Sequence, residues 1–596
     1  MGAIAGWIAT HSRAPDAAAL VPSLEALAHR GNGGGADSAG IFTYRAESGH
    51  CVVLGQSHYD PNSEIALVLD GVIANRLELG KRLAARGHAS EDESCAQLLA
   101  RAYERWDKEV VHQLRGAFAF ALWDARKERL MLARDRFGEK PLYLYEQAGA
   151  LHFASQIKAL AKGPGVRAQP DPGAVRDYLA YRYVPGPRTV LSGVRKLTPG
   201  SYALWQFGRL REVRYWVSPD GRTAAPTQVG EPVAAFTEKL DEAVRERLPA
   251  GILLSGGIDS AMLVALAAKH QKVKTFSAGF ADDAASELAR AAQVAKRFGT
   301  EHHEIVLSPR DVLARLPQAV AERDAPVSRP ADVALYFMAA EVARQGGAPA
   351  VLTGDGADEV LGGYRRHVAE RHWGLRSVPT LLLLAAPLAG RRPRLRAALA
   401  SLRTRDWRER CVRWIGAERN GLLGKALVPP AAGQPPFYAD PGASSLRRAL
   451  YFDQSTWLPD NVLERTDRMT MAASLEARAP FLDHRLVELV SALPDDLRVR
   501  GFATKWILRQ AARPLLAGLA LRKTGFRIPV GAWLRGELRE FLLEHLRGPR
   551  SVTRPYYEAK ILDRLLDEHL AGRRNHEELL WTLLNLEIWL RAWRPA

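Results

Sequence analysis

The first residues that could do chemistry form the hexapeptide SGGIDS, which directly follows the apolar run GILL. Small residues between a strand and a helix let backbone N–H groups close around an anion, and the helix dipole favours negative charge there. We therefore expect Ser255, Gly256 and Gly257 to hold a phosphate, and Ser260 to add a hydroxyl. Asp259 cannot help a phosphate directly, so its carboxylate suggests Mg²⁺. The alternative is a glycine turn that is capped by Ser and Asp.

A second acidic loop, LTGDGADEVLGGY, also comes directly after an apolar strand. Asp355, Asp358 and Glu359 lie in one glycine-rich turn, where like charges are costly unless a cation holds them. We expect this loop to face SGGIDS and Asp358 to be a second Mg²⁺ ligand. The alternative is a solvated acidic loop without a ligand.

The elements before these loops indicate a β-rich domain over residues 1–215. Short apolar runs such as CVVLG, ALVLDG, GAFAFALWD, ERLMLARD, LYLYE and ALHFAS are separated by turn residues, which is typical of strands. LELGKRLAARG and CAQLLARAYERW have helical spacing. PDGRTAAPTQVGEP is rich in Pro, Gly and Thr, and it predicts a linker over residues 216–232.

Residues 233–596 show a different pattern, in which apolar strands alternate with helices. GILLSGG, VKTFSAGF and APAVLTGDG are the strands, and this alternation predicts a parallel sheet with helices on both faces. Ligands of such sheets bind at the carboxyl ends of the strands, which is where both acidic loops lie. The remainder is expected to be mostly helical, and the tryptophans of EELLWTLLNLEIWLRAW are expected to pack in a core.

Several blocks, in this order, resemble the synthetase domain of asparagine synthetases: SGGIDS, GDGADEVLGGY, LPDNVLERTDRMTMAASLEARAPFLDHRLVE and TKWILRQA. LRGAFAFALWDARKERLMLARDRFGEKPLYL and YRYVPGPRTVLSGVRKLTPG resemble the glutaminase domain of the same family. The resemblance covers nearly the whole chain. It implies a two-domain α/β and α+β protein. The N-terminal domain would have Ntn-hydrolase-like (class II glutaminase-like) αββα layers, and the C-terminal domain an adenine-nucleotide α-hydrolase-like (PP-loop) parallel sheet with a helical C-terminal part.

The resemblance also implies a reaction. A substrate carboxylate would attack the α-phosphate of ATP with the help of Mg²⁺, and an amine would then displace AMP from the acyl adenylate to leave an amide. Lys505 matches the family lysine that stabilises the developing charge, and Lys523 in RKTGFRIP and Asp355 are further catalytic candidates; either lysine could instead be a surface residue. The expected ATP and pyrophosphate contacts are Leu254, Ser255, Gly256, Gly257, Asp259, Ser260, Ser277 and Gly354.

Two arginines of the third block have two interpretations. Arg468 and Arg478 could contact the phosphates or the acceptor. They could also hold helices together, and we favour this interpretation. Their partners would then be Asp467, Glu476 and Asp483.

The N-terminal half departs from the resemblance at its chemistry. The family glutaminase relies on a Cys directly after Met, and here Gly2 stands in that place. HRGNGGGADSAG from His29 replaces HRGPDDEG, and DGVIAN from Asp70 replaces NGEIYN. Asp92 is the one glutamine-side carboxylate that could remain. We therefore expect an inactive domain with a structural or docking role.

The nitrogen must then come from elsewhere. Relatives with a degraded glutaminase include β-lactam synthetases and lasso-peptide macrolactam cyclases, in which the substrate's own amine attacks. Asp355 stands where the β-lactam branch usually has Tyr, and Arg329 and Asp332 stand where asparagine synthetases tend to have small residues. These residues favour a macrolactam cyclase. The alternatives are an asparagine synthetase or other amidotransferase that uses ammonia or glutamine, a noncatalytic scaffold, and an RNA-modifying enzyme.

The net charge of +17 reflects arginines scattered along the chain, with one dense cluster near residues 390–410. That cluster has little aromatic interleaving, so nucleic acid is not favoured as a partner. The sequence has no recognisable signal peptide and no run long enough to span a membrane. We expect a cytoplasmic protein without a membrane partner. Its partners would be a carboxylate substrate, such as a peptide, with an amine nucleophile, pathway proteins, and a second copy in a homodimer.

Overall fold

The structure is a computed structural model. It describes residues 2–9, 17–30, 41–46, 51–55, 58–85, 94–147, 149–222, 230–280, 287–327, 329–345, 348, 350–373, 404–415, 422, 440, 442–519 and 528–593. Lys523, Asp92 and most of the basic cluster near residues 390–410 lie outside these ranges.

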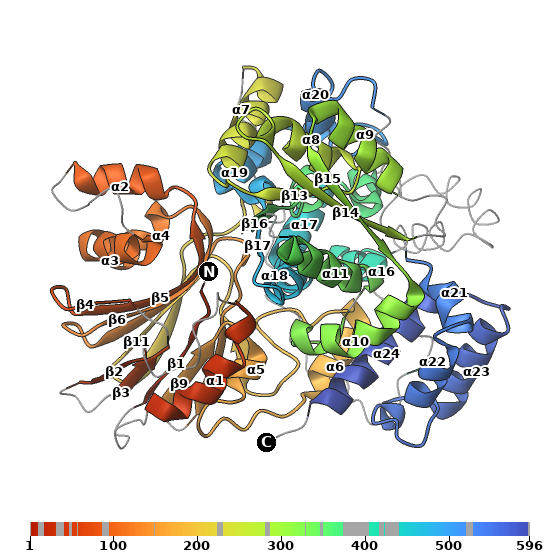
Figure 1. Ribbon diagram of the computed structural model, residues 1–596, viewed down its shortest axis with the longest axis horizontal. Helices are drawn as coiled ribbons and strands as arrows, with labels where there is room; N and C mark the ends of the chain where they lie inside the picture. The colour runs from red at the N-terminus through yellow and green to blue at the C-terminus, as the bar shows by residue number, and fades with distance from the viewer. Residues whose placement is uncertain are drawn as a thin grey trace.

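Two six-stranded antiparallel sheets face each other in the N-terminal half (Figure 1). The first sheet has the order β10 (Val194–Lys196), β8 (Tyr143–Gln147), β9 (Ala150–Ala154), β1 (Ala5–Ala9), β3 (Cys51–Leu54) and β2 (Phe42–Arg45). The second has the order β12 (Arg209–Arg214), β11 (Ser201–Gln206), β7 (Arg129–Arg134), β6 (Gly116–Asp124), β5 (Ile65–Ile73) and β4 (His58–Asp60). All six apolar runs quoted above are strands, so these predictions are confirmed.

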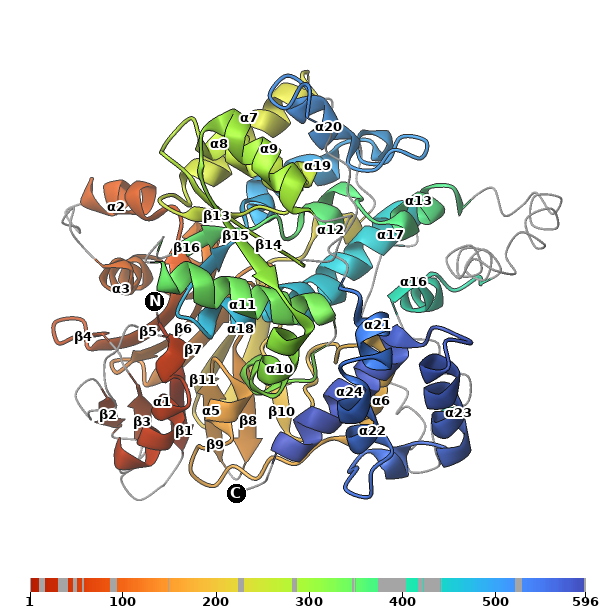
Figure 2. The same cartoon turned by 45° about the vertical axis from the view of Figure 1, so that its right-hand side comes forward.

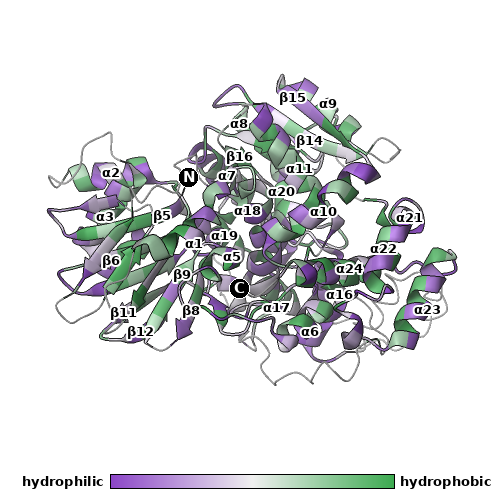
Figure 3. Ribbon diagram, turned by 60° about the horizontal axis from the view of Figure 1, so that its bottom comes forward, coloured by the Kyte–Doolittle hydropathy of each residue, from purple (hydrophilic) through white to green (hydrophobic). Residues whose placement is uncertain are grey.

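Helices cover the outer faces of the two sheets and complete the expected αββα layers. Helices α2 (Arg76–Ala84), α3 (Cys95–Trp106) and α4 (Val110–Gln113) lie on the second sheet, and α1 (Val21–Glu25) and α5 (Ile157–Leu160) lie on the first. The strands carry apolar residues on both faces because both are covered, and β6 is coloured as hydrophobic along most of its length in Figure 3. Trp123, Leu132 and Phe153 pack between the sheets.

The C-terminal half is built on a five-stranded parallel sheet with the order β15 (Glu301–Leu307), β14 (Lys274–Phe280), β13 (Gly251–Leu253), β16 (Ala350–Leu352) and β17 (Glu476–Arg478). One face packs on α7 (Pro232–Arg245), α8 (Ile258–Ala267), α9 (Leu288–Phe298), α19 (His484–Ala492) and α20 (Trp506–Ala512). The other face packs on α11 (Pro330–Arg344) and α18 (Glu464–Met471). Strand β17 lies in the part of the chain that is expected to be mostly helical, and SLEARAP contains no apolar run that predicts a strand.

The remaining elements are helical (Figure 2). They are α6 (Pro172–Tyr181), α10 (Pro309–Arg323), α12 (Ala357–Leu361), α13 (Arg365–Arg371), α16 (Trp407–Ile415), α17 (Ser445–Phe452), the π-helix η7 (Asp453–Leu463), α21 (Val530–Arg535), α22 (Arg539–Leu546), α23 (Ala559–Leu570) and α24 (Glu577–Ala592). Trp581 and Trp589 of α24 are buried, as predicted. Within the described ranges, no helix is long and apolar enough to cross a membrane.

Part of the segment expected to be a linker is anchored. Asp220, in a short 3₁₀ turn (Pro219–Gly221), is fully buried and pairs with Arg498 at 2.7 Å. Gln454 donates a second hydrogen bond to Asp220 at 2.9 Å. A buried ion pair therefore holds the start of the segment that is expected to be a linker.

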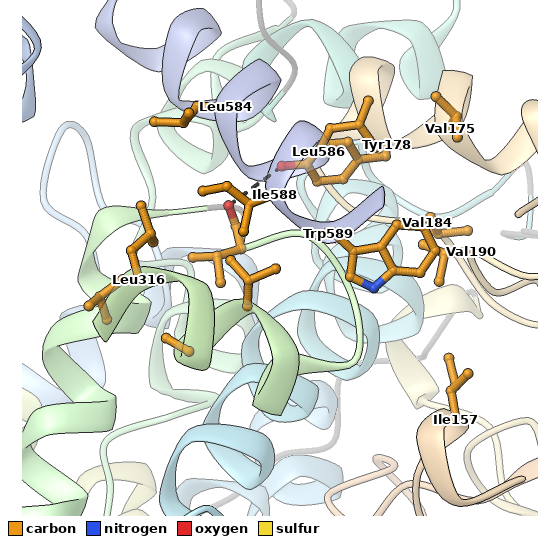
Figure 4. Packing of buried hydrophobic residues seen from close by; sticks show 14 of the residues in the cluster. Ile157, Val175, Tyr178, Val184, Val190, Leu316, Leu584, Leu586, Ile588 and Trp589 are labelled. Carbon is orange, nitrogen blue, oxygen red and sulfur yellow. Dashed lines mark hydrogen bonds between the residues drawn. The ribbon is translucent and has the colours of Figure 1, made fainter. Parts of the chain in front are cut away.

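The two halves share a hydrophobic core (Figure 4). Ile157 and Tyr178 of the N-terminal half pack in one cluster with Leu316 of α10 and Trp589 of α24. The halves are therefore held together by apolar burial as well as by the chain connection.

Candidate active site

The SGGIDS loop connects β13 to α8, as the sequence predicts. Gly256 has φ +67°, and a Cβ there would lie 2.9 Å from the Cβ of Arg290, so the tight turn requires glycine. The hydroxyl of Ser260 lies 3.2 Å from both the backbone nitrogen and the hydroxyl of Ser255. Ser255 is exposed at the start of α8, where an anion can approach the helix N-terminus.

The second acidic loop connects β16 to α12 and faces the first loop. A Cβ on Gly354 would lie 3.2 Å from the Cβ of Asp259, so the two loops are in close contact. Ser277, in the middle of the neighbouring β14, donates its hydroxyl hydrogen bond to the carbonyl of Leu254. Ser277 is buried, and in this structure it supports the loop from below.

Lys505 joins the two loops. Its Nζ lies 2.7 Å from both carboxylate oxygens of Asp259 and 2.6 Å from Oδ1 of Asp358. The residue is 2% exposed and has φ +53°, directly before α20. Burial opposes its charge, but the two carboxylates outweigh burial and raise the pKa of Lys505. The alternative of a surface lysine is therefore wrong.

Asp259 and Asp358 fit a magnesium ion. They come from different loops, and both already contact one cationic atom, Nζ of Lys505. No cluster of three or more acidic, His or Cys side chains suited to a metal occurs in the described part of the chain. Mg²⁺ commonly takes one or two carboxylates and completes its shell with substrate phosphates and water, so two carboxylates suffice.

The three carboxylates of the second loop have separate partners. Asp355 accepts hydrogen bonds from the hydroxyls of Thr353 at 3.0 Å and Thr466 at 2.8 Å. The hydroxyl of Tyr364 donates a hydrogen bond to Glu359. Burial and the neighbouring Asp358 raise the pKa of Glu359 to about 7. Of the three carboxylates, Asp358 is the one that shares a partner, Lys505, with Asp259.

A cationic wall lies beside Asp355. Nη2 of Arg465 is 3.5 Å from Asp355, and Nε of Arg465 is 3.7 Å from the buried Asp332. Arg329 stacks over Trp457 with its Cζ 4.7 Å from the ring centroid. Loss of water contacts lowers the pKa of Arg329 to about 10, so it stays charged at neutral pH. Guanidinium groups of this kind can bind a substrate carboxylate.

The two arginines of the third block have structural roles, as favoured above. Arg478 pairs with Glu476 at 2.8 Å. Arg468 lies 3.8 Å from Asp467 and stacks over Tyr143. Asp483 was expected to pair with one of these two arginines. Its partners are instead Arg485 and Arg247.

Comparison with known proteins identifies the family. A model described as asparagine synthase matches residues 235–591. The chain belongs to the asparagine synthase family. A second model, a glutamine amidotransferase domain, matches residues 1–216. Asparagine synthase relatives indicate that the chain is an enzyme that forms carbon–nitrogen bonds.

Similar members of the asparagine synthase family align over most of the chain. Asparagine synthetase [glutamine-hydrolyzing] 1 of Bacillus subtilis is 31% identical over 88% of this chain and 85% of its own length. A putative asparagine synthetase [glutamine-hydrolyzing] of Mycobacterium bovis is 33% identical over 88% and 84%. A protein named amidase chyE of Penicillium rubens is 27% identical over 81% and 80%.

Residue 2, shortly before the first strand, has no room for a side chain. Gly2 precedes β1, and a Cβ built on it would overlap with the backbone carbonyl oxygen of Leu69. Asp70, the next residue, accepts hydrogen bonds from Arg30 at 2.9 Å and from Ser155 at 2.7 Å. Because residue 2 is glycine, β5 can approach this part of the chain closely.

Sequence reasoning missed Thr466, Arg465, Tyr364 and Gly363. A Cβ on Gly363 would overlap with Oδ1 of Asp358 and Cε of Lys505, so its absence lets this pair form. The second glycine of LGGY was a signal that could have been used. Thr466 carries no such signal, because its partner is 111 residues away.

Proposed function

We propose that this chain is an ATP-dependent, AMP-forming amide ligase that works without glutamine and joins a carboxylate to an amine of its own substrate. A lasso-peptide-type macrolactam cyclase is the form we favour. The observation that carries this proposal is at Gly2, which offers no thiol and leaves no room for one beside Leu69. An intact synthetase site beside a glutaminase without a nucleophile requires another nitrogen source.

The chain's own residues suit both steps of such a reaction. The substrate carboxylate would attack the α-phosphorus of ATP while the bond to pyrophosphate breaks. The amine nitrogen would then attack the acyl carbon, AMP would leave, and the nitrogen would lose a proton. The backbone of Ser255, Gly256 and Gly257 would bind pyrophosphate in a PP-loop-like cradle, and Lys505 would offset the charge that develops. Asp259 and Asp358 would hold Mg²⁺, which supplies positive charge to the phosphates.

The cationic wall supports a carboxylate substrate. Arg465 offers N–H donors beside Asp355, and Arg329, which stacks on the ring of Trp457, adds a second guanidinium near Arg465. A peptide that carries Asp or Glu would present such a carboxylate on a flexible side chain, and its terminal amine would supply the nucleophile. Pathway proteins that deliver the peptide, a homodimer and a cytoplasmic location remain part of this proposal.

Mass spectrometry tests the proposal. Purified protein would be incubated with ATP, Mg²⁺ and candidate peptides encoded beside it, with no glutamine or ammonia added. We expect a product lighter than the peptide by one water, together with AMP and pyrophosphate. The same mixture with Asp358→Asn protein is the control. Asparagine formation from aspartate with ammonia or glutamine, without any peptide product, would contradict the proposal.

A second candidate is an asparagine synthetase that uses free ammonia or ammonia from a partner glutaminase. The 31% identity to the Bacillus subtilis enzyme over most of both chains favours it. It predicts asparagine from aspartate, ATP and ammonia, and no product with glutamine alone.

Restoring the nucleophile should fail. We expect Gly2→Cys to release no glutamate from glutamine, because its Cβ overlaps with the Leu69 carbonyl and Asp70 replaces the family amide. Gly2→Ala is the matched control, since it introduces the same Cβ without a thiol. Both should lower the thermal unfolding midpoint by similar amounts. Glutamate release by Gly2→Cys, measured with a coupled glutamate assay, would show the pocket to be intact.

A further inference from the structure

Three buried carboxylates lie on one face of a continuous helical segment made of η7 and α18. Asp460, Glu464 and Asp467 are four and three residues apart, and each is 4% exposed. Side chains at this spacing share one helix face. A row of buried carboxylates is stable only if each has a cationic or hydrogen-bonding partner.

The partners come largely from the N-terminal domain. Lys196 of β10 contacts Asp460 and Glu464, and Tyr143 of β8 donates a hydrogen bond to Glu464. Arg30 and Lys140 contact Asp467. We call these four residues, Arg30, Lys140, Tyr143 and Lys196, the brace.

Lys196 uses its whole donor capacity in the brace. Its Nζ donates to Asp460 at 3.0 Å, to Glu464 at 3.0 Å and to the carbonyl of Val184 at 3.2 Å. An ammonium has three N–H donors, so the three bonds fix its position. The backbone N–H of Gly186 donates a further hydrogen bond to Asp460 at 2.7 Å. The start of α18 is therefore fixed to the N-terminal domain.

Asp467 fixes the next turn of α18. Arg30 donates to both of its oxygens, at 2.7 and 2.9 Å, and Lys140 donates at 3.2 Å. Burial opposes the charge of Asp467, but Arg30 and Lys140 outweigh burial and hold its pKa below the usual range. Arg30 also holds Asp70, so the segment that replaces the glutamine pocket takes part in the contact.

The residues between these carboxylates reach the synthetase site. Arg465 and Thr466 lie between Glu464 and Asp467 in sequence, and both contact Asp355. An α-helix turns as one body, so a rotation or shift that released the carboxylates would also move the hydroxyl of Thr466 from Asp355.

We propose that the N-terminal domain serves the synthetase site as a positioning domain. The brace sets the rotation of α18 and thereby places Thr466 and Arg465 against Asp355. Lys196, Lys140 and Arg30 are thus positioning residues for the ligase reaction. The mechanical part of this inference is that the brace fixes α18 against Asp355, and it does not depend on the proposed function. The catalytic part is that this placement supports the ligase reaction, and it rests on the proposed function.

Hydrogen–deuterium exchange of the full-length protein tests the mechanical part. We expect Lys196→Met to speed amide exchange in residues 464–471 and in residues 353–361. Glu464 retains Arg323 at 3.3 Å in this variant, and Asp460 retains Gly186, which favours folding. Lys140→Met is a milder second variant, since Asp467 keeps Arg30. The control is Arg115→Met, which breaks a pair with Glu246 that also joins the two halves but lies at the C-terminal cap of α7.

Kinetics test the catalytic part, at a temperature well below the unfolding midpoint of every variant. We expect Lys196→Met to lower kcat by about 10- to 100-fold, the range that misplacement of a reacting group produces. Arg115→Met should leave kcat within about twofold. In a double-mutant cycle, Lys196→Met should add little to the loss caused by Thr466→Val, because both act through Asp355.

Either readout can overturn the proposal. Unchanged exchange of residues 353–361 in both lysine variants would refute the mechanical part, whether or not the protein forms an amide. Losses from Lys196→Met and Thr466→Val that multiply would refute the action through Asp355. If no acid and amine give a product but exchange responds as expected, the proposed function fails and the positioning role of the domain stands.

Discussion

At the residue scale, the candidate site is organised by one buried lysine. Lys505 takes the position between Asp259 and Asp358, and therefore neutralises two carboxylates that the fold brings together. The same carboxylates are the proposed Mg²⁺ ligands, so lysine and metal compete for the same charges. This competition can be measured without any substrate.

We expect Lys505→Met to lower the free energy of unfolding in EDTA by on the order of 3 kcal/mol, because two partly buried carboxylates lose their cation. Added Mg²⁺ should then raise the thermal unfolding midpoint of the variant more than that of the unmodified protein. The control is Lys127→Met, which changes an exposed lysine far from the site. Equal Mg²⁺ shifts in all three proteins would refute the metal assignment.

Gly363 tests how closely Lys505 and Asp358 must approach. We expect Gly363→Ala to abolish ATP–pyrophosphate exchange, because the added methyl occupies the space of the pair. Gly230→Ala is the matched control, since a Cβ there meets nothing within 4 Å. Retained exchange in Gly363→Ala would show that the pair separates during the reaction.

The loops of the site could be predicted from sequence, whereas their supports could not. SGGIDS and GDGADE carry local signals, since glycine and acidic residues follow an apolar strand. The contact of Thr466 with Asp355 depends on how α18 packs, and nothing in ERTDRM specifies it. Lys505 was predicted only through the family resemblance, because a lysine beside Trp506 has no pattern of its own.

At the element scale, the charged face of η7 and α18 should show in the pH dependence of stability. Burial alone would raise the pKa of Glu464. The opposite effect of Lys196, Arg323 and Arg468 is larger, so the pKa of Glu464 lies well below its usual 4.5. A carboxylate with a lowered pKa in the folded state contributes its stabilisation above the unfolded value and loses it as pH falls. Burial opposes the charge of Lys196, but Asp460 and Glu464 outweigh burial and raise its pKa. Lys196 therefore contributes its full stabilisation below about pH 10.5 and loses it at higher pH.

We therefore expect the unfolding midpoint of Glu464→Gln to lie well below that of the unmodified protein between pH 5 and pH 10. The difference should shrink as pH falls from about 4.5 to 3, where the carboxyl of the unfolded chain is already protonated. Differential scanning calorimetry at pH 7, 5, 4 and 3 measures it. A difference that stays constant over this range would contradict the assigned charge of Glu464.

Strand and helix positions were largely predictable, with exceptions that have physical causes. The alternation of apolar runs and turns predicted β3, β5, β6, β7, β8 and β9 of the N-terminal sheets and β13, β14 and β16 of the parallel sheet. Strand β17 has three residues and exists because it pairs with β16, far away in sequence. The π-helix η7 contains Pro459 and mixed polar residues, and its buried charges read as surface residues in the sequence.

At the scale of the whole molecule, the two domains fold around a shared interior. Side chains from both halves form the cluster of Figure 4, including Tyr178 and Trp589. Asp220, in the segment expected to be a linker, is buried against Arg498. The domain boundaries that composition predicts therefore mark the place where the fold class changes. The parts on either side share one hydrophobic cluster.

We expect a fragment of residues 216–596 to be insoluble or molten. It would expose the apolar side chains of α10 and α24 that face the N-terminal domain, and would leave Asp460 and Asp467 without their cations. Co-expression with residues 1–215 as a separate chain should restore a soluble complex, as size-exclusion chromatography would show. A monodisperse fragment with a sharp unfolding transition would refute this expectation.

The carboxylates of η7 and α18 also restrict how this protein can change over evolutionary time. A gene that lost its first 215 codons would remove Lys196 from Asp460 and would remove Arg30 and Lys140 from Asp467. Glu464 would lose Lys196 but keep Arg323. A shorter enzyme would have to replace Asp460 and Asp467 before the deletion could be tolerated, and each replacement alone would weaken the longer one. Deletion of the N-terminal domain in a single genetic step would therefore leave buried charges of the neighbouring domain without their partners, whatever reaction the N-terminal domain itself carries out.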